Sequence, residues 1–215
     1  MEREQGWQVV DERRVLVANL LETLTPEEWA TPSLCRGWTV RDVAAHLSMA
    51  ATSTPGEVVG HLVRARGSFD RMIRDSAVER AARPTTRIVE DLRGVVGSRK
   101  LAPTTFWRDP LLDILVHGED IALPLGKRLP PHPEAAGTAA EWAWARRFPF
   151  FPSRRLRGVR LVADDVEWSR GSGAEVRGPA TALLLLSTGR VAGLAETAGP
   201  GADVVRARLT GQRLE

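Results

Sequence analysis

One helical segment constrains this chain more than any other, because it carries acidic and imidazole side chains along one face. Residues 109–121 are mostly apolar, yet Asp113, His117 and Asp120 follow one another at intervals of four and three residues. That spacing places the three side chains on one face of an α-helix. Because the rest of the helix is apolar nearly all round, we expect this polar face to be turned toward a protein interior. Buried carboxylates and imidazoles are costly unless they are paired or bind a metal, so the pattern predicts either a metal site or a hydrogen-bonded His–Asp pair.

A second predicted helix supplies a further imidazole, that of His46. The cap-x-x-acid pattern of residues 39–42 opens this helix, and we interpret Asp42 as its cap rather than as a partner that orients His46. Helical bundles build metal sites from inward-facing side chains on facing helices. We therefore predict His46, Asp113 and His117 as metal ligands. Two imidazoles and one carboxylate suit zinc with one position left open, and nickel or iron(II) could use the same set.

Three further polar residues lie near these ligands in the sequence. Asp120 is either a fourth ligand or an outer acceptor that orients His117, and we favour the acceptor. Glu119 points away from the polar face and is expected to be solvated. Cys35 could be a redox or nucleophilic thiol, but no histidine stands beside it in the sequence, so we interpret it as structural.

Composition narrows the class of protein. The chain of 215 residues has 43% hydrophobic and 27% charged residues, as an ordinary globular protein does. Its apolar runs are too short for a transmembrane helix, and residues 1–5 carry no apolar signal core, so we expect no membrane partner. The net charge is +3 and acidic residues are interspersed among the basic ones, so the sequence shows no basic block of the kind that binds nucleic acid. The single cysteine fits a reducing cytoplasm, whereas the oligomeric state cannot be read from the sequence.

The pattern of the sequence changes near residue 150. Before it, helical periodicity predicts an all-α part over residues 1–150, including one long helix from residue 55 to about 75. After it, residues 151–215 predict a small α+β domain, so the fold class is α+β. Three strands are expected there, with residues 171–173 as a hairpin turn between the second and the third, followed by a buried helix over residues 180–187.

Three segments of the chain resemble the mycothiol-dependent maleylpyruvate isomerase family of the DinB-like superfamily. The first covers residues 29–47 and reads WATPSLCRGWTVRDVAAHL. The second covers residues 113–126 and reads DILVHGEDIALPLG. The third, residues 175–190, reads EVRGPATALLLLSTGR and resembles the C-terminal domain of the family. The resemblance extends over most of the chain, and its first motif is the most specific.

The resemblance implies an architecture and a set of ligands. It implies an antiparallel four-helix bundle over residues 1–150 and a shortened, sterol-carrier-like domain over residues 151–215. It also implies a metal bound by a histidine, an acid and a histidine, which correspond here to His46, Asp113 and His117. The isomerase uses glutamate at the position of Asp113, so the shorter aspartate is a departure from the family pattern.

The function that follows is a metal-dependent enzyme that uses mycothiol as a cosubstrate. It would carry out an isomerisation or an S-transfer on a small electrophilic substrate. Arginines would hold carboxylates of the substrate by paired hydrogen bonds, and among Arg71, Arg74 and Arg190 we select Arg74 and Arg190 as catalytic candidates. Two alternatives stay open, a non-catalytic protein that senses a thiol or a metal, and a hydrolase that uses metal-bound water.

Overall fold

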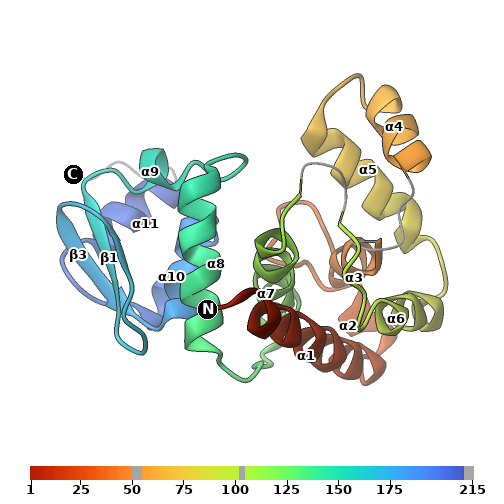
Figure 1. Ribbon diagram of the computed structural model, residues 1–215, viewed down its shortest axis with the longest axis horizontal. Coiled ribbons are helices and arrows are strands. Elements are labelled where there is room, and N and C mark those ends of the chain that lie inside the picture. The colour runs from red at the N-terminus through yellow and green to blue at the C-terminus, as the bar shows by residue number, and fades with distance from the viewer. Residues whose placement is uncertain (50–54, 102–104, 211–215) are drawn as a thin grey trace. The chain divides into compact units, whose positions relative to one another are not determined.

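The chain folds into two compact units in a computed structural model that describes residues 1–49, 55–101 and 105–210. The first unit is Arg3–Leu129, and the second is Pro130–Glu215 together with Met1–Glu2. The elements of the first unit, all helical, are α1 (Arg3–Glu22), α2 (Pro26–Trp29), α3 (Val40–Met49), α4 (Pro55–Arg64), α5 (Phe69–Ala81), α6 (Thr85–Gly94), α7 (Arg108–Ala122) and the 3-10 helix η1 (Leu123–Leu125) (Figure 1). No helix in these described ranges is both long and apolar enough to cross a membrane.

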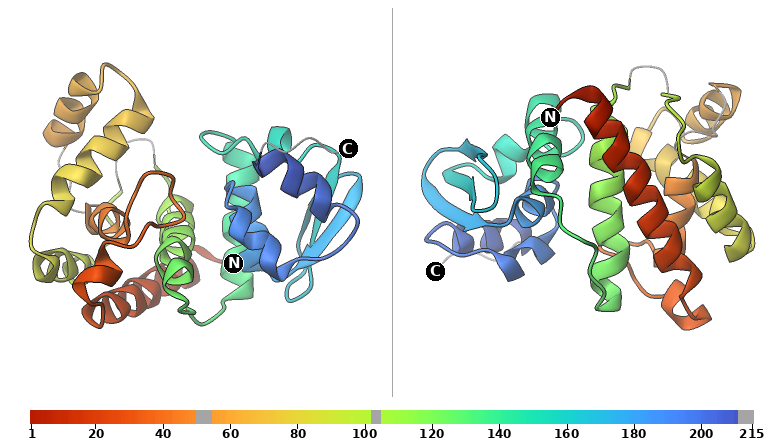
Figure 2. Two further views of the ribbon diagram at one scale, coloured as in Figure 1. Left: turned by 180° about the vertical axis from the view of Figure 1, so that it is seen from behind. Right: turned by 60° about the horizontal axis from the view of Figure 1, so that its bottom comes forward.

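Helices α1 and α3 organise the first unit. Each of them packs against both α6 and α7, and α3 also packs against α5 (Figure 2). Most of the buried side chains of these helices are apolar, among them Val17 and Leu21 of α1, Val43 of α3, Leu92 of α6 and Leu111 of α7. The antiparallel four-helix bundle itself stays a prediction at this point.

Local sequence sets where several of these helices begin and end. Arg66 and Gly67 both have positive φ angles, of 53° and 76°, so the chain leaves the helical conformation there. The single helix expected from residue 55 to 75 is therefore two helices, α4 and α5, and that prediction was wrong in its length. Helix α7 ends as expected, because Pro124 lies in η1 and Gly126 adopts the left-handed conformation at φ 66°.

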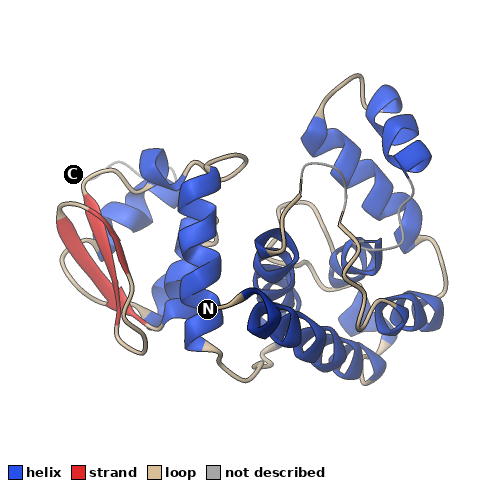
Figure 3. Cartoon of the chain, viewed as in Figure 1, coloured by secondary structure: helices blue, strands red, loops and turns tan. Residues whose placement is uncertain are grey.

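The second unit combines a small sheet with helices (Figure 3). Its elements are α8 (Pro133–Arg146), α9 (Pro152–Arg155), β1 (Val159–Ala163), β2 (Ser169–Gly171), β3 (Ala174–Gly178), α10 (Ala180–Ser187), the 3-10 helix η2 (Val191–Glu196) and α11 (Ala202–Thr210). The strand order is β2-β1-β3, with β1 antiparallel to β2 and parallel to β3. Together with the helical unit, this sheet makes the chain a helix-rich α+β protein.

The turn between β2 and β3 differs from the expected hairpin. Strand β3 does not pair with β2 but with the other edge of β1. Gly171 and Gly173 have φ angles of 88° and 117°, and a Cβ atom on Gly173 would lie only 2.2 Å from the carbonyl oxygen of Gly158. The glycines thus let the chain pass close to the start of β1 and reach its far side, which a side chain would prevent.

Helix α8 belongs to the second unit. It packs against α10, and its buried face is built from alanine and glycine, which allows the leucines of α10 to approach closely. The indole of Trp144 donates a hydrogen bond to Ser187 Oγ at 3.1 Å and joins the two helices further. Along the chain, the boundary between the two units falls between Leu129 and Pro130. The sequence pattern predicted the boundary between the all-α part and the α+β domain near residue 150.

Candidate metal centre

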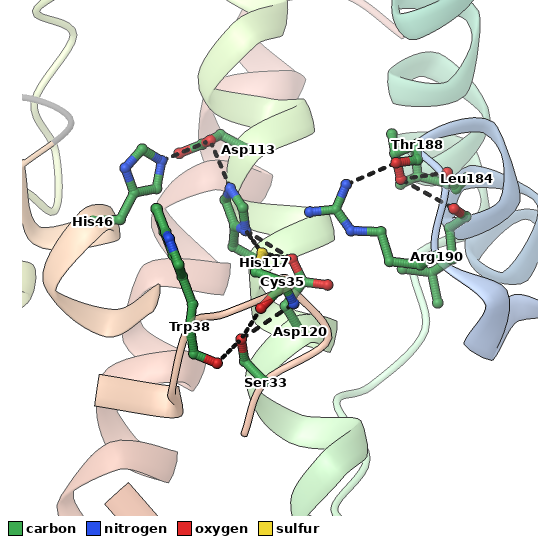
Figure 4. Close-up of polar contacts among 11 residues, drawn as sticks. Ser33, Cys35, Trp38, His46, Asp113, His117, Asp120, Leu184, Thr188 and Arg190 are labelled. Atoms are coloured by element: carbon green, nitrogen blue, oxygen red, sulfur yellow. Dashed lines mark hydrogen bonds and ion pairs between the residues drawn. The ribbon is translucent and has the colours of Figure 1, made fainter. Parts of the chain in front are cut away.

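Helices α3 and α7 bring His46, Asp113 and His117 together. Asp113 Oδ1 lies 3.3 Å from His46 Nε2 and 3.4 Å from His117 Nε2 (Figure 4). One nitrogen or oxygen atom from each residue lies within 4.8 Å of the other two, a separation that a single cation can bridge. The centroids of the two imidazole rings are 5.0 Å apart, and the rings are nearly perpendicular. The spacing of four residues on α7 places Asp113 and His117 one turn apart, and α3 supplies the third group.

The three side chains are only partly buried. Their exposed fractions are 17% for His46, 30% for Asp113 and 15% for His117, so solvent or a small molecule reaches the cluster. Burial lowers the pKa of His46, but the charge and the hydrogen bond of Asp113 outweigh it, and the pKa lies above its ordinary value of 6.5. The cluster therefore favours positive charge at this point.

The second nitrogen of His117 is held by Asp120. Asp120 Oδ2 lies 2.8 Å from His117 Nδ1, and the side chain of Asp120 is 0% exposed. Because a carboxylate only accepts hydrogen bonds, Nδ1 carries the proton in this pair. In the neutral imidazole the lone pair then lies on Nε2, which faces the Asp113 oxygen. Two acceptors that face each other require a proton or a cation between them, so the donor set fits a divalent metal.

The loop before α3 contacts both histidines. The ring of Trp38 packs edge-on against His46, with centroids 5.6 Å apart. Cys35 Sγ lies 3.0 Å from Asp120 Oδ2 and 3.6 Å from His117 Nδ1. Sequence reasoning missed this contact of Cys35, because its partners lie more than 80 residues away along the chain. The signal that could have found it is the first family-like motif, which contains both Cys35 and Trp38.

Two acidic residues beside the site have structural partners. Asp42 Oδ2 accepts hydrogen bonds from Thr39 N at 2.8 Å and Thr39 Oγ1 at 2.7 Å, so Asp42 caps α3 as expected. Glu119 was expected to be solvated and is instead only 7% exposed. Burial raises its pKa, and the charge of Arg13, which is also buried on α1, acts in the opposite direction. Ten of the fifteen residues of α7 are buried, and Glu119 is one of them.

The two predicted catalytic arginines lie in different units. Arg74 is exposed on α5 of the first unit. Arg190 lies in the second unit, between α10 and η2, where its guanidinium donates a hydrogen bond to the carbonyl oxygen of Thr188 at 2.9 Å. Its side chain is half-buried, and Figure 4 shows it beside its partner. The catalytic role of each arginine stays a prediction.

Comparison with known proteins places the chain in a family. The family model described as the mycothiol maleylpyruvate isomerase N-terminal domain matches residues 10–122, which is more than half of the chain. The chain belongs to this family. The match begins within α1 and ends at the last residue of α7, so it includes both helices that carry the candidate ligands.

Solved structures show a similar fold over nearly the whole chain. The mycothiol-dependent maleylpyruvate isomerase superposes with a TM-score of 0.63, at 12% identity, and the match covers 94% of both chains. A variant of that isomerase with one histidine replaced by alanine gives a TM-score of 0.64 at the same identity and coverage. No curated protein sequence matches the chain significantly. At 12% identity this similarity is a similarity of fold. Because the match covers 94% of the chain, it includes the second unit.

Proposed function

We propose that the protein is a metal-dependent enzyme that uses mycothiol as a cosubstrate, either to isomerise a small electrophilic substrate or to join the thiol to it in an S-transfer. The observation that carries this proposal is the cluster of His46, Asp113 and His117 within a chain of the mycothiol maleylpyruvate isomerase family. Two solved structures of similar fold bear the name of an isomerase that depends on mycothiol. In this proposal α1, α3, α6 and α7, which pack pairwise, form the four-helix bundle that holds the site.

His46 Nε2, His117 Nε2 and a carboxylate oxygen of Asp113 would hold the metal. We propose zinc, and nickel or iron(II) would suit the same donors. When bound, such a cation supplies a Lewis acid that lowers the pKa of a coordinating thiol, so that the thiolate forms at neutral pH. Asp113 stands where the isomerase has glutamate and is one methylene shorter, so this chain would hold its ion and its substrate at a different distance from α7.

The remaining residues of the site orient the ligands and leave them accessible. Asp120 keeps the proton of His117 on Nδ1, which leaves the Nε2 lone pair for the cation. Trp38 covers one edge of His46. The exposed 30% of Asp113 gives a small thiol access to the ligands. Arg74 and Arg190 are proposed to bind carboxylates of the substrate by paired hydrogen bonds.

The chemistry of the cosubstrate accounts for both proposed reactions. When bound, mycothiol would supply a nucleophilic thiolate for an electrophilic carbon of the substrate, either for addition to a double bond or for displacement of a leaving group such as chloride. If that carbon belongs to a conjugated double bond, addition leaves a single bond about which the product geometry is reached by rotation. Elimination then restores the double bond and returns the thiol, which gives a cis–trans isomerisation. If the adduct is released instead, the reaction is an S-transfer.

Turnover measured with and without thiol tests this proposal. The purified protein, loaded with zinc, is assayed with maleylpyruvate and with chlorodinitrobenzene in the presence or absence of mycothiol. We expect turnover of at least one of them only with mycothiol, and loss of that turnover in His46→Ala. Turnover that needs zinc but no thiol would indicate the hydrolase alternative. Binding of zinc or mycothiol without any turnover would indicate the sensing alternative and contradict the enzyme.

A further inference from the structure

A second polar cluster lies behind the candidate ligands, on the side of His117 that faces away from Asp113. It consists of Cys35 Sγ, Asp120 Oδ2 and His117 Nδ1. The sulfur lies 3.0 Å from the carboxylate oxygen, and the ring nitrogen lies 2.8 Å from the same oxygen. Asp120 has no exposed side-chain surface, so its charge is stabilised by groups of the protein, these two donors among them, rather than by water.

The loop before α3 fixes the position of the thiol. The backbone N–H of Leu34 donates to the carbonyl oxygen of Asp120 at 3.3 Å, which fastens the loop to α7. The hydroxyl of Ser33 accepts a hydrogen bond from Cys35 N at 3.1 Å and donates one to the carbonyl oxygen of Trp38 at 2.9 Å (Figure 4). These contacts hold the backbone of Cys35 beside α7, and from there its sulfur reaches Asp120 Oδ2.

We propose that Cys35 is a positioning residue for the metal centre. Its S–H donates to Asp120 Oδ2 and holds the carboxylate in the orientation in which it accepts the Nδ1 proton of His117. The fixed tautomer and ring angle of His117 direct Nε2 toward Asp113. Cys35 thus acts on the metal through two intermediate side chains and touches neither the metal nor the substrate. The inference rests on the proposed metal site and adds a residue to it.

The alternative is that Cys35, Asp120 and His117 Nδ1 bind a cation directly, since all three are ligand types. The distances favour hydrogen bonds. Ligand atoms about 2.0–2.3 Å from one tetrahedral ion lie more than about 3.2 Å apart. The 2.8 Å between Nδ1 and Oδ2 is shorter than that and is typical of a charge-assisted hydrogen bond. The complete burial of Asp120 also leaves little room for water to complete the coordination of an ion.

Variants at position 35 distinguish two roles of the thiol, as a hydrogen-bond donor and as a group that fills space. Cys35→Ala removes the donor, Cys35→Val removes it while the larger apolar side chain still fills the space, and Cys35→Ser keeps a hydroxyl donor as the conservative control. Zinc affinity of each full-length variant is measured by competition with a chromophoric chelator. The tautomer of His117 is measured in the metal-free protein by nitrogen-15 NMR of labelled histidine. Thermal unfolding confirms that each variant is folded.

We expect Cys35→Ala and Cys35→Val to weaken zinc binding about tenfold, as is usual for the loss of a partner that orients a ligand. Both should also populate the Nε2–H tautomer of His117, whereas Cys35→Ser should keep the Nδ1–H tautomer and stay within about threefold of the unchanged protein. Unchanged affinity and tautomer in both Cys35→Ala and Cys35→Val overturn the positioning role. If the protein binds a second equivalent of zinc and every variant at position 35 loses it, Cys35 is a direct ligand. That result also overturns the positioning role.

The proposed function fails in a different way. If His46→Ala keeps the same zinc affinity as the unchanged protein, the metal centre itself is wrong. If His46→Ala loses zinc while the variants at position 35 do not, only the role of Cys35 is wrong. The two failures are therefore distinguishable in one titration series.

Discussion

Helices α7 and α10 are both buried, but they are buried for different reasons. In α10, seven of eight residues are buried and they are alanine and leucine with one serine, whose hydroxyl bonds to the helix backbone and to Trp144. In α7, ten residues are buried, and they include Glu119 and Asp120, with Asp113 and His117 half-buried beside them. Burial of apolar side chains stabilises a fold, whereas burial of charged groups costs free energy unless they are paired.

The difference leads to separate expectations for the two helices, a structural role for α10 and the proposed metal-binding role for α7. On the polar face of α7, Asp113 and Asp120 lie beside the two nitrogens of His117, at 3.4 Å from Nε2 and 2.8 Å from Nδ1. Such an arrangement adds little stability compared with an apolar face of the same size. Substitutions in α10 should therefore change stability, and substitutions on the polar face of α7 should change metal binding and activity.

The largest effect is expected for His117→Ala. Removal of this ligand should reduce mycothiol-dependent turnover to background, by more than about 100-fold, since even the loss of an outer partner of a ligand costs 10–100-fold. Steady-state rates at saturating zinc are the measurement, and His61→Ala on α4 is the control. Equal losses in the two variants would show that the effect is not specific to the cluster.

In contrast to His117→Ala, the substitution Leu183→Ala in α10 should change stability and not zinc binding. Leu183 is fully buried, so its truncation should lower the free energy of unfolding by about 2–5 kcal/mol. Urea denaturation monitored by tryptophan fluorescence gives this value, and zinc affinity below the transition should be unchanged. A loss of zinc affinity in the folded variant would contradict the division of roles between the two helices.

Substitutions at Asp113 test whether its carboxylate contributes to zinc binding. Asp113→Asn keeps the size of the side chain but removes its charge, and zinc affinity should fall about 100-fold. Asp113→Glu restores the residue type that the resemblance gives for the isomerase, and it should keep zinc while changing the turnover number. Chelator competition and steady-state rates measure the two properties separately. Equal zinc affinity in Asp113→Asn and the unchanged protein would remove Asp113 from the ligand set.

The smallest effects are expected at the arginines. Arg74→Gln and Arg190→Gln should each raise KM for a carboxylate substrate about tenfold with little change in zinc affinity, because each removes a charged hydrogen bond to substrate. Arg87→Gln is the control, since Arg87 is exposed and pairs with Glu90. An unchanged KM in either variant excludes that arginine from the substrate site.

The shared helix face of Asp113 and His117 could be predicted from the sequence because its information is local, whereas their role as metal ligands stays a prediction. Asp113 and His117 are four residues apart on one helix, and an apolar background made their face conspicuous. One imidazole beside an apolar stripe is ambiguous, so the prediction for His46 depended on the general pattern of metal sites in helical bundles, and the family resemblance implied the same residue. Some other contacts between residues that are distant in the sequence were not predicted. Cys35 meets Asp120 only after folding, and β3 passes β2 to pair with β1 only because Gly173 approaches the Gly158 carbonyl.

Metal content per chain is the measurement that tests the central claim most directly. The unchanged protein and His46→Ala, Asp113→Asn and His117→Ala are loaded with zinc, desalted and analysed by native mass spectrometry together with elemental analysis. The account predicts one zinc per unchanged chain and little or none in the three variants, all of them folded. A full equivalent of zinc retained in His46→Ala or His117→Ala would contradict it.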